Sequence, residues 1–252
     1  MSNDRIHNAQ LRSRIVSPEQ AAALIQHGET VAMSGFTGSG YPKVVPLALA
    51  ARIEQAHEAG TPFQIQVWTG ASTAPELDGA LAKVDGIAMR LPFQSDPDAR
   101  KRINDGRMDY IDMHLSHVAQ QVWFGMHGEI DTAIIEVSAI RENGLLVPST
   151  SVGNNKTWLD LPKKVIIEVN RWQPADVDGM HDIYYGTALP PGRKPIPLVH
   201  ADDRIGERYL RCDLDKIVAV VETDGPDRNS PFTPADEGSQ RIAAYLVDFL
   251  QH

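Results

Sequence analysis

The amino-acid sequence predicts a three-layer α/β domain, with a mostly parallel sheet and helices on both of its faces. Strand and helix signals alternate along the chain, which is the pattern of such folds. The run at residues 132–137 is apolar at its centre on both faces, as expected for a parallel strand that is covered on both sides. Several apolar runs end in glycine, serine or threonine. Because ligands in these folds bind at the carboxyl ends of the strands, we expect a site at that edge.

The first elements are a helix, a strand and a second helix that follows a glycine-rich loop. A capping box at residues 17–20 starts a helix that ends at Gly28. Residues 30–33 form a short apolar run, which predicts a buried strand, and residues 34–43 form the loop. The apolar residues after the loop have helical spacing, and this helix stops at Gly60.

The later elements continue the same alternation. Strands are expected at residues 63–68, 87–91, 110–111, 165–169 and 217–221, and helices near residue 97, at 116–123 and from about 234 to 252. Glu142-Asn143-Gly144 predicts the turn of a hairpin. A proline-rich irregular segment at residues 173–197 separates the last two core strands.

Composition and charge narrow the classes of function. The chain has 252 residues, 42% of them hydrophobic, and no long apolar run, so we expect a buried core and no membrane span. The net charge of −9 disfavours nucleic acid as a partner, because binding to phosphate backbones needs a basic surface. The N-terminus lacks an apolar signal region, and the single Cys212 cannot form an internal disulfide. Both favour a cytoplasmic location.

The glycine-rich loop fits neither of two common phosphate-binding motifs. A P-loop needs Lys and then Ser or Thr after its last glycine, but Tyr41 follows Gly40. The dinucleotide fingerprint needs a small residue three positions after its second glycine, where this sequence has Lys43. Glycines still let the backbone approach a ligand closely, and the following helix points free N–H groups at the same place. The alternative is a strand-to-helix turn without a ligand.

Small hydroxyl and amide side chains gather in the loops that are expected at this edge. These loops are residues 35–40, 70–73, 92–96 and 149–155. Ser72 is a candidate for positioning a ligand, or it hydrogen-bonds within its own loop. Ser95 is a second candidate, or a hydroxyl at a helix N-terminus beside Asp96. Asn154 lies in a segment that offers donors to an acyl oxygen, or that is only a solvated turn.

Arg228 is a candidate for binding an anion, and a pair of histidines is a candidate for binding a metal. An arginine presented by a strand-end loop suits a carboxylate or phosphate, because its fork donates two parallel hydrogen bonds, and Arg228 is such a residue. Alternatively it pairs with Asp227 or Asp224 to order the loop. His114 and His117 are three positions apart and could share a helix face, but no third ligand has suitable spacing, so we expect two surface histidines and no metal site.

Five segments in a fixed order carry a family resemblance. They are residues 34–43 (SGFTGSGYPK), 69–73 (TGAST), 151–155 (SVGNN), 165–170 (VIIEVN) and 227–229 (DRN). Together they resemble the acetyl-CoA hydrolase/transferase family of class I CoA-transferases, and most of all its members that exchange CoA between succinyl-CoA and acetate. The likeness runs from Arg5 to the C-terminus. Several motifs in order are more specific than any single glycine loop.

The resemblance implies the CoA-transferase-like fold and an enzyme about twice as long, whose N-terminal half corresponds to residues 1–252. In the family, a glutamate of the second half attacks the acyl-CoA to give an acyl anhydride and then a glutamyl-CoA thioester, which the acceptor carboxylate reopens. That glutamate lies in a Glu-Val-Ile-Gln-Asp-Gly segment, and a Gly-Val-Gly-Asn loop contacts CoA; this sequence has neither. We therefore expect the isolated chain to be inactive: a deliberately shortened chain, a truncated gene product or one subunit of a split enzyme.

One glutamate within the chain offers a substitute nucleophile. Glu142 lies in a segment that resembles the Ser-Glu-Asn-Gly catalytic segment of other class I transferases, although Arg141 replaces the serine. A hairpin turn accounts for the same residues. We therefore expect no catalytic residue in this chain.

The resemblance also implies roles for the loop residues. Arg228, Ser72 and Ser95 would be auxiliary residues that face the glutamate across a cleft, and Gly38, Ser39, Gly40 and Asn154 would bind the substrate. The implied partners are an acyl-CoA, a small carboxylate, the C-terminal half and a second copy in a homodimer. Coenzyme A would be a substrate and not a permanently bound cofactor. The alternatives are an acyl-CoA hydrolase of the same fold and a non-catalytic CoA-binding or scaffolding module.

Overall fold

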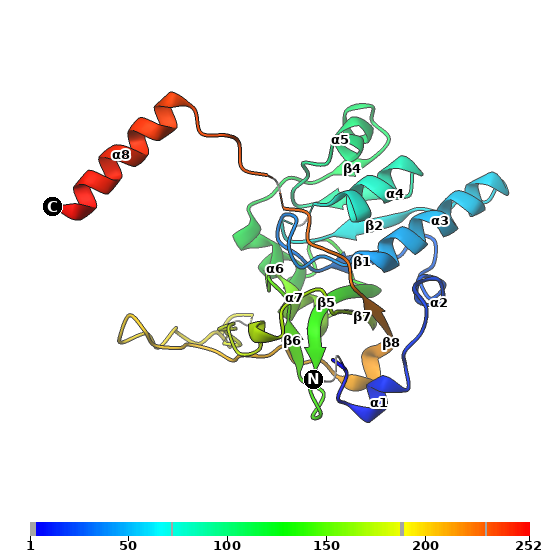
Figure 1. The fold of residues 1–252 in the computed structure, drawn as a ribbon. Coiled ribbons are helices and arrows are strands. Elements are labelled where there is room, and N and C mark those ends of the chain that lie inside the picture. Colours follow the sequence, from blue (N-terminus) through cyan, green and yellow to red (C-terminus); the bar gives the residue numbers. More distant parts are fainter. Residues whose placement is uncertain (1–3, 72, 187–188, 230) are drawn as a thin grey trace.

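The computed structural model describes residues 4–71, 73–186, 189–229 and 231–252 (Figure 1). Its strands are β1 (Thr30–Met33), β2 (Ile65–Trp68), β3 (Ile87–Leu91), β4 (Asp109–Tyr110), β5 (Thr132–Ile140), β6 (Leu146–Pro148), β7 (Lys164–Asn170) and β8 (Ile217–Thr223). Its helices are α1 (Ala9–Arg12), α2 (Pro18–Ala22), α3 (Val44–Glu58), α4 (Ala80–Lys83), α5 (Pro97–Asn104), α6 (Leu115–Trp123), α7 (Asn155–Asp160) and α8 (Glu237–Gln251). Three short turns complete the set: η1 (Pro75–Gly79), η2 (Ala175–Val177) and η3 (Leu214–Lys216).

The strands form one sheet in the order β4-β3-β2-β1-β5-β7-β8, and β6 pairs with β5 off this path. Neighbours along the path are parallel, whereas β5 and β6 are antiparallel around the predicted turn at residues 142–144. The prediction of a mostly parallel sheet with a hairpin is confirmed. β1 lies near the middle of the sheet, so the loop after it opens at the centre of the carboxyl edge.

Alternate residues of the central strands enter two hydrophobic cores, one on each face of the sheet. Val31 and Ile134 pack with α2, α3 and α4 on one face. Ala32 and Ile135 pack with α6 and α7 on the other. Because successive side chains of a strand point to opposite faces, strands that are buried on both sides must be apolar throughout. This confirms the expected three layers.

Some element boundaries differ from the sequence prediction. The capping box at Ser17 and Gln20 is present, but α2 ends at Ala22 and not at Gly28. Gly28 has φ +82° and donates its N–H to Gln64 O at 2.8 Å, so it forms the turn into β1 and does not cap the helix. The turn η1 and the helices α1, α4 and α7 were not predicted, because each is too short to show a helical period.

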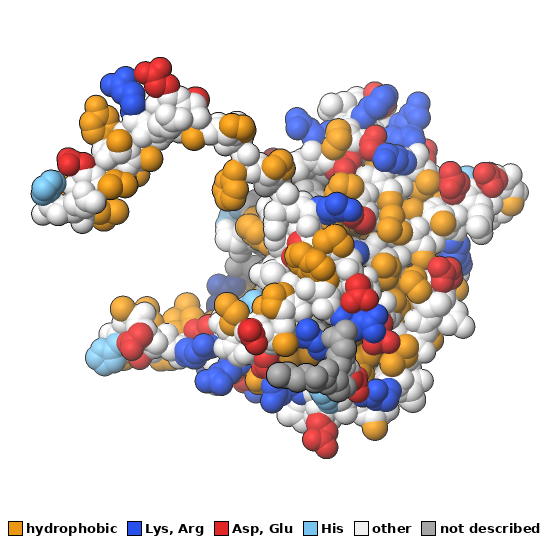
Figure 2. All heavy atoms as spheres, in the orientation of Figure 1, with side chains coloured by type: hydrophobic (Ala, Val, Ile, Leu, Met, Phe, Trp, Pro, Cys, Tyr) orange, Lys and Arg blue, Asp and Glu red, His pale blue; other side chains and the backbone are white. Residues whose placement is uncertain are grey.

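Two segments project from the body of the protein. The chain around residues 189–205 forms an arm, and α8 stands apart at the end of an extended linker (Figure 1). Every residue of α8 is exposed. Figure 2 shows hydrophobic side chains along both segments; those of α8 include Ile242, Leu246, Phe249 and Leu250. No helix of the described residues is long and apolar enough to cross a membrane.

Candidate functional site

The glycine-rich loop after β1 and the loop after β8 touch at the carboxyl edge of the sheet. The Arg228 N–H donates to Gly38 O at 2.9 Å. The Ser39 hydroxyl donates to Asn229 Oδ1 at 2.7 Å. A Cβ on Gly38 would lie 2.1 Å from the Arg228 carbonyl oxygen, so only glycine permits this approach. The structure therefore brings Gly38, Ser39 and Arg228 together.

The loops after β2 and β3 join the same edge through hydroxyl groups. The Thr73 N–H donates to Thr37 O at 3.3 Å, and the Thr73 and Ser95 hydroxyls lie 2.9 Å apart. Asp96, and not Ser95, caps α5, since its carboxylate accepts from the N–H groups of Asp98 and Ala99. Ser95 is thus linked to the glycine-rich loop. Ser72 lies outside the described residues.

The loop after β6 covers Gly40. Gly40 has φ +64°, and a Cβ built on it would lie 2.5 Å from Ser151 Oγ and 2.8 Å from Ser149 Oγ. Asn154 reaches the neighbouring loop, where its Nδ2 lies 3.7 Å from the Cβ position of Gly70. We call this assembly of strand-end segments (residues 35–40, 69–71, 73–76, 92–96, 149–155 and 224–229) the rim.

The side chain of Arg228 pairs with a residue that the sequence did not indicate. Arg228 Nε donates to Glu76 Oε1 at 3.0 Å. The alternative pairing of Arg228 with Asp227 or Asp224 was wrong. Asp227 lies 2.9 Å from Lys43 Nζ, and Asp224 pairs with Arg171 at 2.7 Å. Both acids thus have nearer cations.

Asp227 joins the glycine-rich loop, the loop after β6 and Gln173 with one carboxylate. Its Oδ1 accepts from the Gly40 N–H at 3.1 Å and lies 2.9 Å from Lys43 Nζ. Its Oδ2 accepts from Thr150 Oγ1 at 2.8 Å and from Gln173 Nε2 at 3.1 Å. Burial alone would raise the pKa of Asp227, but the hydrogen bond and charge of Lys43 hold it below its usual range. Asp227 is therefore ionised and fixes the backbone next to Arg228.

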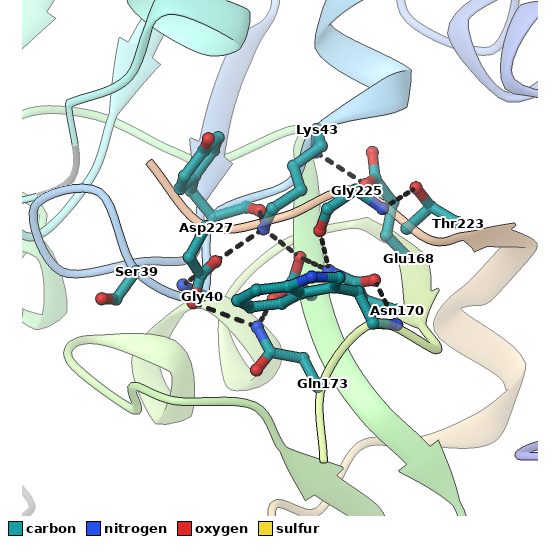
Figure 3. A network of polar contacts seen from close by, with 12 residues as sticks. Ser39, Gly40, Lys43, Glu168, Asn170, Gln173, Thr223, Gly225 and Asp227 are labelled. Atoms are coloured by element: carbon teal, nitrogen blue, oxygen red, sulfur yellow. Dashed lines mark hydrogen bonds and ion pairs between the residues drawn. The ribbon is translucent and has the colours of Figure 1, made fainter. Parts of the chain in front are cut away.

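Lys43 connects Asp227 to two further carboxylates beneath the rim (Figure 3). Its Nζ lies 2.5 Å from Glu136 Oε2, and the backbone N–H groups of Lys43 and Val45 each donate to Glu168 at 2.7 Å. Burial raises the pKa of Glu136 although Lys43 opposes the shift, and burial raises the pKa of Glu168 to about 7. Three carboxyl groups thus lie around one cation here. We call this group the Lys43 cluster: Lys43, Glu136, Glu168, Asn170, Gln173 and Asp227.

The amides of Asn170 and Gln173 complete the cluster. Asn170 Nδ2 donates to Glu136 Oε2 at 2.9 Å and to Gly225 O at 2.8 Å. Gln173 Nε2 donates to Glu136 Oε1 at 3.1 Å. Gly225 must be small, because a Cβ there would lie 2.7 Å from Lys43 Cδ. The loop after β8 is therefore seated directly on the lysine stem.

Other candidates lie away from the rim. Glu142 is exposed at the hairpin turn, where its carbonyl accepts from Asn8 Nδ2 at 2.9 Å. His114 and His117 are exposed, with ring centroids 5.5 Å apart. Within the described residues no three His, Cys, Asp or Glu side chains gather as metal ligands would.

Sequence reasoning missed the residues that hold the rim together. Glu136 and Glu168 are charged residues inside otherwise apolar strands, and a buried carboxylate needs a compensating partner. That signal was present in the sequence. The identity of the partner was not, since Lys43 and Asp227 are distant from both glutamates in the chain. No feature of the sequence indicated a role for Glu76.

Solved structures with a similar fold define the class of this domain. The structure described as "Crystal Structure of RipA from Yersinia pestis" aligns with a TM-score of 0.67 at 17% identity, covering 95% of this chain and 49% of that chain. Glutaconate coenzyme A-transferase from Acidaminococcus fermentans aligns with a TM-score of 0.50 at 11% identity, covering 62% and 67%. At these identities the likeness concerns the fold alone, which is the α/β fold of CoA-transferases.

The sequence defines the family within that class. Residues 1–222 match the acetyl-CoA hydrolase/transferase N-terminal domain, so the chain belongs to the acetyl-CoA hydrolase/transferase family. It is 43% identical to succinyl-CoA:acetate CoA-transferase of Clostridium kluyveri, over 99% of this chain and 46% of that protein. It is also 43% identical to propanoyl-CoA:succinate CoA transferase of Escherichia coli, over 93% and 48%, and 39% identical to acetyl-CoA hydrolase of Schizosaccharomyces pombe, over 99% and 49%. The chain spans about half the length of these relatives.

Proposed function

We propose that this chain is the N-terminal half of a CoA-transferase. The enzyme would move CoA between a short-chain acyl-CoA, such as succinyl-CoA or acetyl-CoA, and a carboxylate such as acetate. A glutamate on the C-terminal half would carry the glutamyl-CoA thioester. The observation that carries this proposal is the rim, where Gly38, Ser39 and Arg228 meet at the carboxyl edge of the sheet. The type of reaction is inferred from membership of the family.

In this proposal the rim forms one wall of a site shared with the second half. Arg228 would neutralise a carboxylate as charge moves among acyl group, glutamate and thiolate. The backbone of Gly38 and Gly40, with Ser39 and Asn154, would bind the substrate. Ser95 and Ser72 would position it as auxiliary hydroxyls.

Two observations support a C-terminal half as the partner. The family match ends at residue 222, near the end of β8, and the relatives continue for about as many residues again. Beyond that point α8 exposes an apolar stripe at positions 242, 245, 246, 249 and 250, the spacing of one face of a helix. A 15-residue helix is marginal alone in water, so this face needs a surface to cover it. We infer that the second half covers it.

The test is reconstitution of the two halves. The chain is mixed with the C-terminal half of the Clostridium kluyveri relative, and transfer of CoA from succinyl-CoA to acetate is measured beside hydrolysis. We expect transfer only with both halves, and an unchanged rate for Glu142→Gln, since Glu142 lies at a distant turn. Transfer by the chain alone, lost in Glu142→Gln, would overturn the proposal.

A hydrolase of the same fold is the second candidate function. The 39% identity to an acetyl-CoA hydrolase of Schizosaccharomyces pombe favours it. Hydrolysis of acetyl-CoA by the two halves, without transfer to acetate, would assign this function. Tight binding of CoA to the chain alone, measured by calorimetry, would instead assign a self-sufficient binding or scaffolding module.

We infer further that the protein acts in the cytoplasm as a homodimer. The single, free Cys212 supports a reducing location, because disulfides are characteristic of oxidising compartments. The exposed apolar side chains of the arm, Ile196, Leu198 and Val199, support a self-association surface. Light scattering of the two-half complex tests the dimer, and a single copy of each half would contradict it.

A further inference from the structure

Glu76 is the charged residue of the rim to which neither the family resemblance nor the sequence gives a role. It lies in the π-helical turn η1, where the Gly79 N–H donates to Ala74 O at 3.2 Å. A π-helical turn is rare and occurs often at functional sites. Only 19% of the Glu76 side chain is exposed, whereas 59% of its partner Arg228 is exposed. A mostly enclosed carboxylate therefore holds an open arginine.

Both carboxylate oxygens of Glu76 accept a hydrogen bond, and each has a different donor. Oε1 accepts from Arg228 Nε at 3.0 Å, and Oε2 accepts from the Tyr41 hydroxyl at 2.9 Å. Tyr41 is fully buried, and Lys43 Nζ lies 4.2 Å from the centroid of its ring. Burial, with the hydrogen bond to Glu76, raises the pKa of Tyr41, so the phenol always donates. Tyr41 thus fixes Glu76, and Glu76 fixes one edge of the guanidinium.

The main chain of Arg228 is fixed as well. Its N–H donates to Gly38 O, and its carbonyl lies against Gly38. The bonds to the main chain and to Nε together restrict the orientation of the guanidinium. Among the described residues, its two terminal nitrogens make no hydrogen bond or ion pair. These nitrogens form the edge that binds a planar carboxylate through two parallel hydrogen bonds.

The local charge also selects among anions. Arg228 and Glu76 cancel each other, and in the layer below Asp227 already matches the charge of Lys43. A cluster with no net positive charge suits a single carboxylate. It does not suit a phosphate group that carries two or more charges.

We propose that Glu76, held by Tyr41, is a positioning and specificity-determining residue: it orients the Arg228 guanidinium for a substrate carboxylate and excludes phosphate groups. This inference rests on the proposed function, which assigns a carboxylate to Arg228. It predicts that the orientation depends on an acceptor at position 76, whereas the exclusion of phosphate depends on its negative charge. The two effects are separated by Glu76→Met, which removes both, and Glu76→Gln, which keeps an acceptor and removes the charge.

The experiment is an NMR titration of the nitrogen-15-labelled chain with succinate and with pyrophosphate. The Nε–H signal of Arg228 is assigned by its disappearance in Arg228→Lys. In the wild type, succinate shifts this signal and pyrophosphate does not. We expect Glu76→Met to weaken succinate binding about tenfold and to move the free signal. We expect Glu76→Gln to keep succinate binding and to bind pyrophosphate about tenfold more tightly.

Matched controls are Glu58→Met and Glu58→Gln, which make the same chemical changes at an exposed residue of α3. Both should behave as the wild type, and Tyr41→Phe should resemble a mild form of Glu76→Met. Wild-type succinate binding in Glu76→Met would overturn the positioning role, and unchanged pyrophosphate binding in Glu76→Gln would overturn the specificity role. If instead Arg228→Lys binds succinate as the wild type does, the assignment of a carboxylate to Arg228 in the proposed function fails. The free Nε–H signal still reports whether Glu76 orients the arginine.

Discussion

Two buried charge clusters lie in the sheet region, and they differ in balance. In the Arg90 pair, Arg90 Nε donates to Asp78 Oδ1 at 2.7 Å, and Gln94 Nε2 donates to the same oxygen at 2.8 Å. In the Lys43 cluster, one ammonium group serves Glu136 and Asp227, with Glu168 close by. The Arg90 pair matches one cation to one anion. The Lys43 cluster places one cation among three carboxyl groups.

Both groups touch the rim. Asp78 of the Arg90 pair accepts hydrogen bonds from Gln94 and from the Ala74 N–H, whereas the Lys43 cluster reaches the loops that carry Gly40 and Arg228. Its Asp227 receives the Gly40 N–H and adjoins Arg228 in the chain, so the charges that shift pKa values also shape the rim. Strongly perturbed carboxylates are commonest at functional sites. The Lys43 cluster therefore couples the fold to Gly40 and Arg228, whereas the Arg90 pair fixes the loops after β2 and β3. The predictions below test this difference.

The largest effect is expected from Lys43→Met. Removing one partner of a buried ion pair leaves uncompensated charge and costs roughly 3–5 kcal/mol of the free energy of unfolding. Without Lys43, Glu136 must be protonated in the folded protein, which raises its folded pKa further above its unfolded value. Such a group loses stability as pH rises. Urea unfolding should therefore show a larger loss at pH 8 than at pH 5.

Arg90→Met is the control for that experiment, since it also removes the cation of a fully buried pair. The Lys43→Met, Glu136→Gln double variant should regain part of the stability, because it no longer buries an unpaired carboxylate at position 136. A loss in Lys43→Met that is equal at both pH values would show that Glu136 does not become an unpaired buried carboxylate.

The next largest effect is expected from Gly38→Ala. The new methyl group would lie 2.1 Å from the Arg228 carbonyl oxygen, and 2.8 Å from the Asn229 N atom, so the two rim loops must separate. Overpacking of this kind costs about 1–3 kcal/mol. The Arg228 amide should also lose its protection from hydrogen exchange, because its acceptor is Gly38 O. Gly70→Ala is the control, since its methyl group meets Gly35 O at an ordinary 3.5 Å.

The sequence predicts those features of the fold and site that depend on residues close together in the chain, and it does not predict the pairing of distant residues. The core strands and the hairpin turn at residues 142–144 follow from local apolar runs and from Asn-Gly chemistry, and the structure has them. The meeting of Gly38 with Arg228 follows from the rule that parallel strands end at one edge. The partner of Arg228 does not follow from any local pattern. The sequence offers Asp227 one position away, but the register of the sheet commits Asp227 to Lys43 and leaves Arg228 to Glu76.

A third prediction concerns the pH dependence that Glu168 gives to stability. Burial raises its pKa from 4.5 to about 7, so the folded protein binds a proton that the unfolded chain releases. The stability from this proton is fully present below pH 4.5 and is lost as pH rises through about 7, with a slope of up to about 1.4 kcal/mol per pH unit. Glu168→Gln should flatten the plot of unfolding free energy against pH between 5 and 7. An unchanged slope, equal to that of the exposed control Glu58→Gln, would mean that Glu168 is not the group that binds this proton in the folded protein.

The smallest effect is expected at an ion pair with the same spacing as the Arg90 pair but a different environment. Lys101 Nζ of α5 and Oδ2 of its C-cap residue Asp105 lie 2.7 Å apart, and 73% of the lysine side chain is exposed. Water and salt screen such a pair, so the N–O distance alone says little about its energy. Lys101→Met should leave the urea midpoint within error of the wild type at both pH values, whereas Arg90→Met should lower it clearly. A comparable loss in the two variants would mean that burial does not decide how much an ion pair contributes to the stability of this fold.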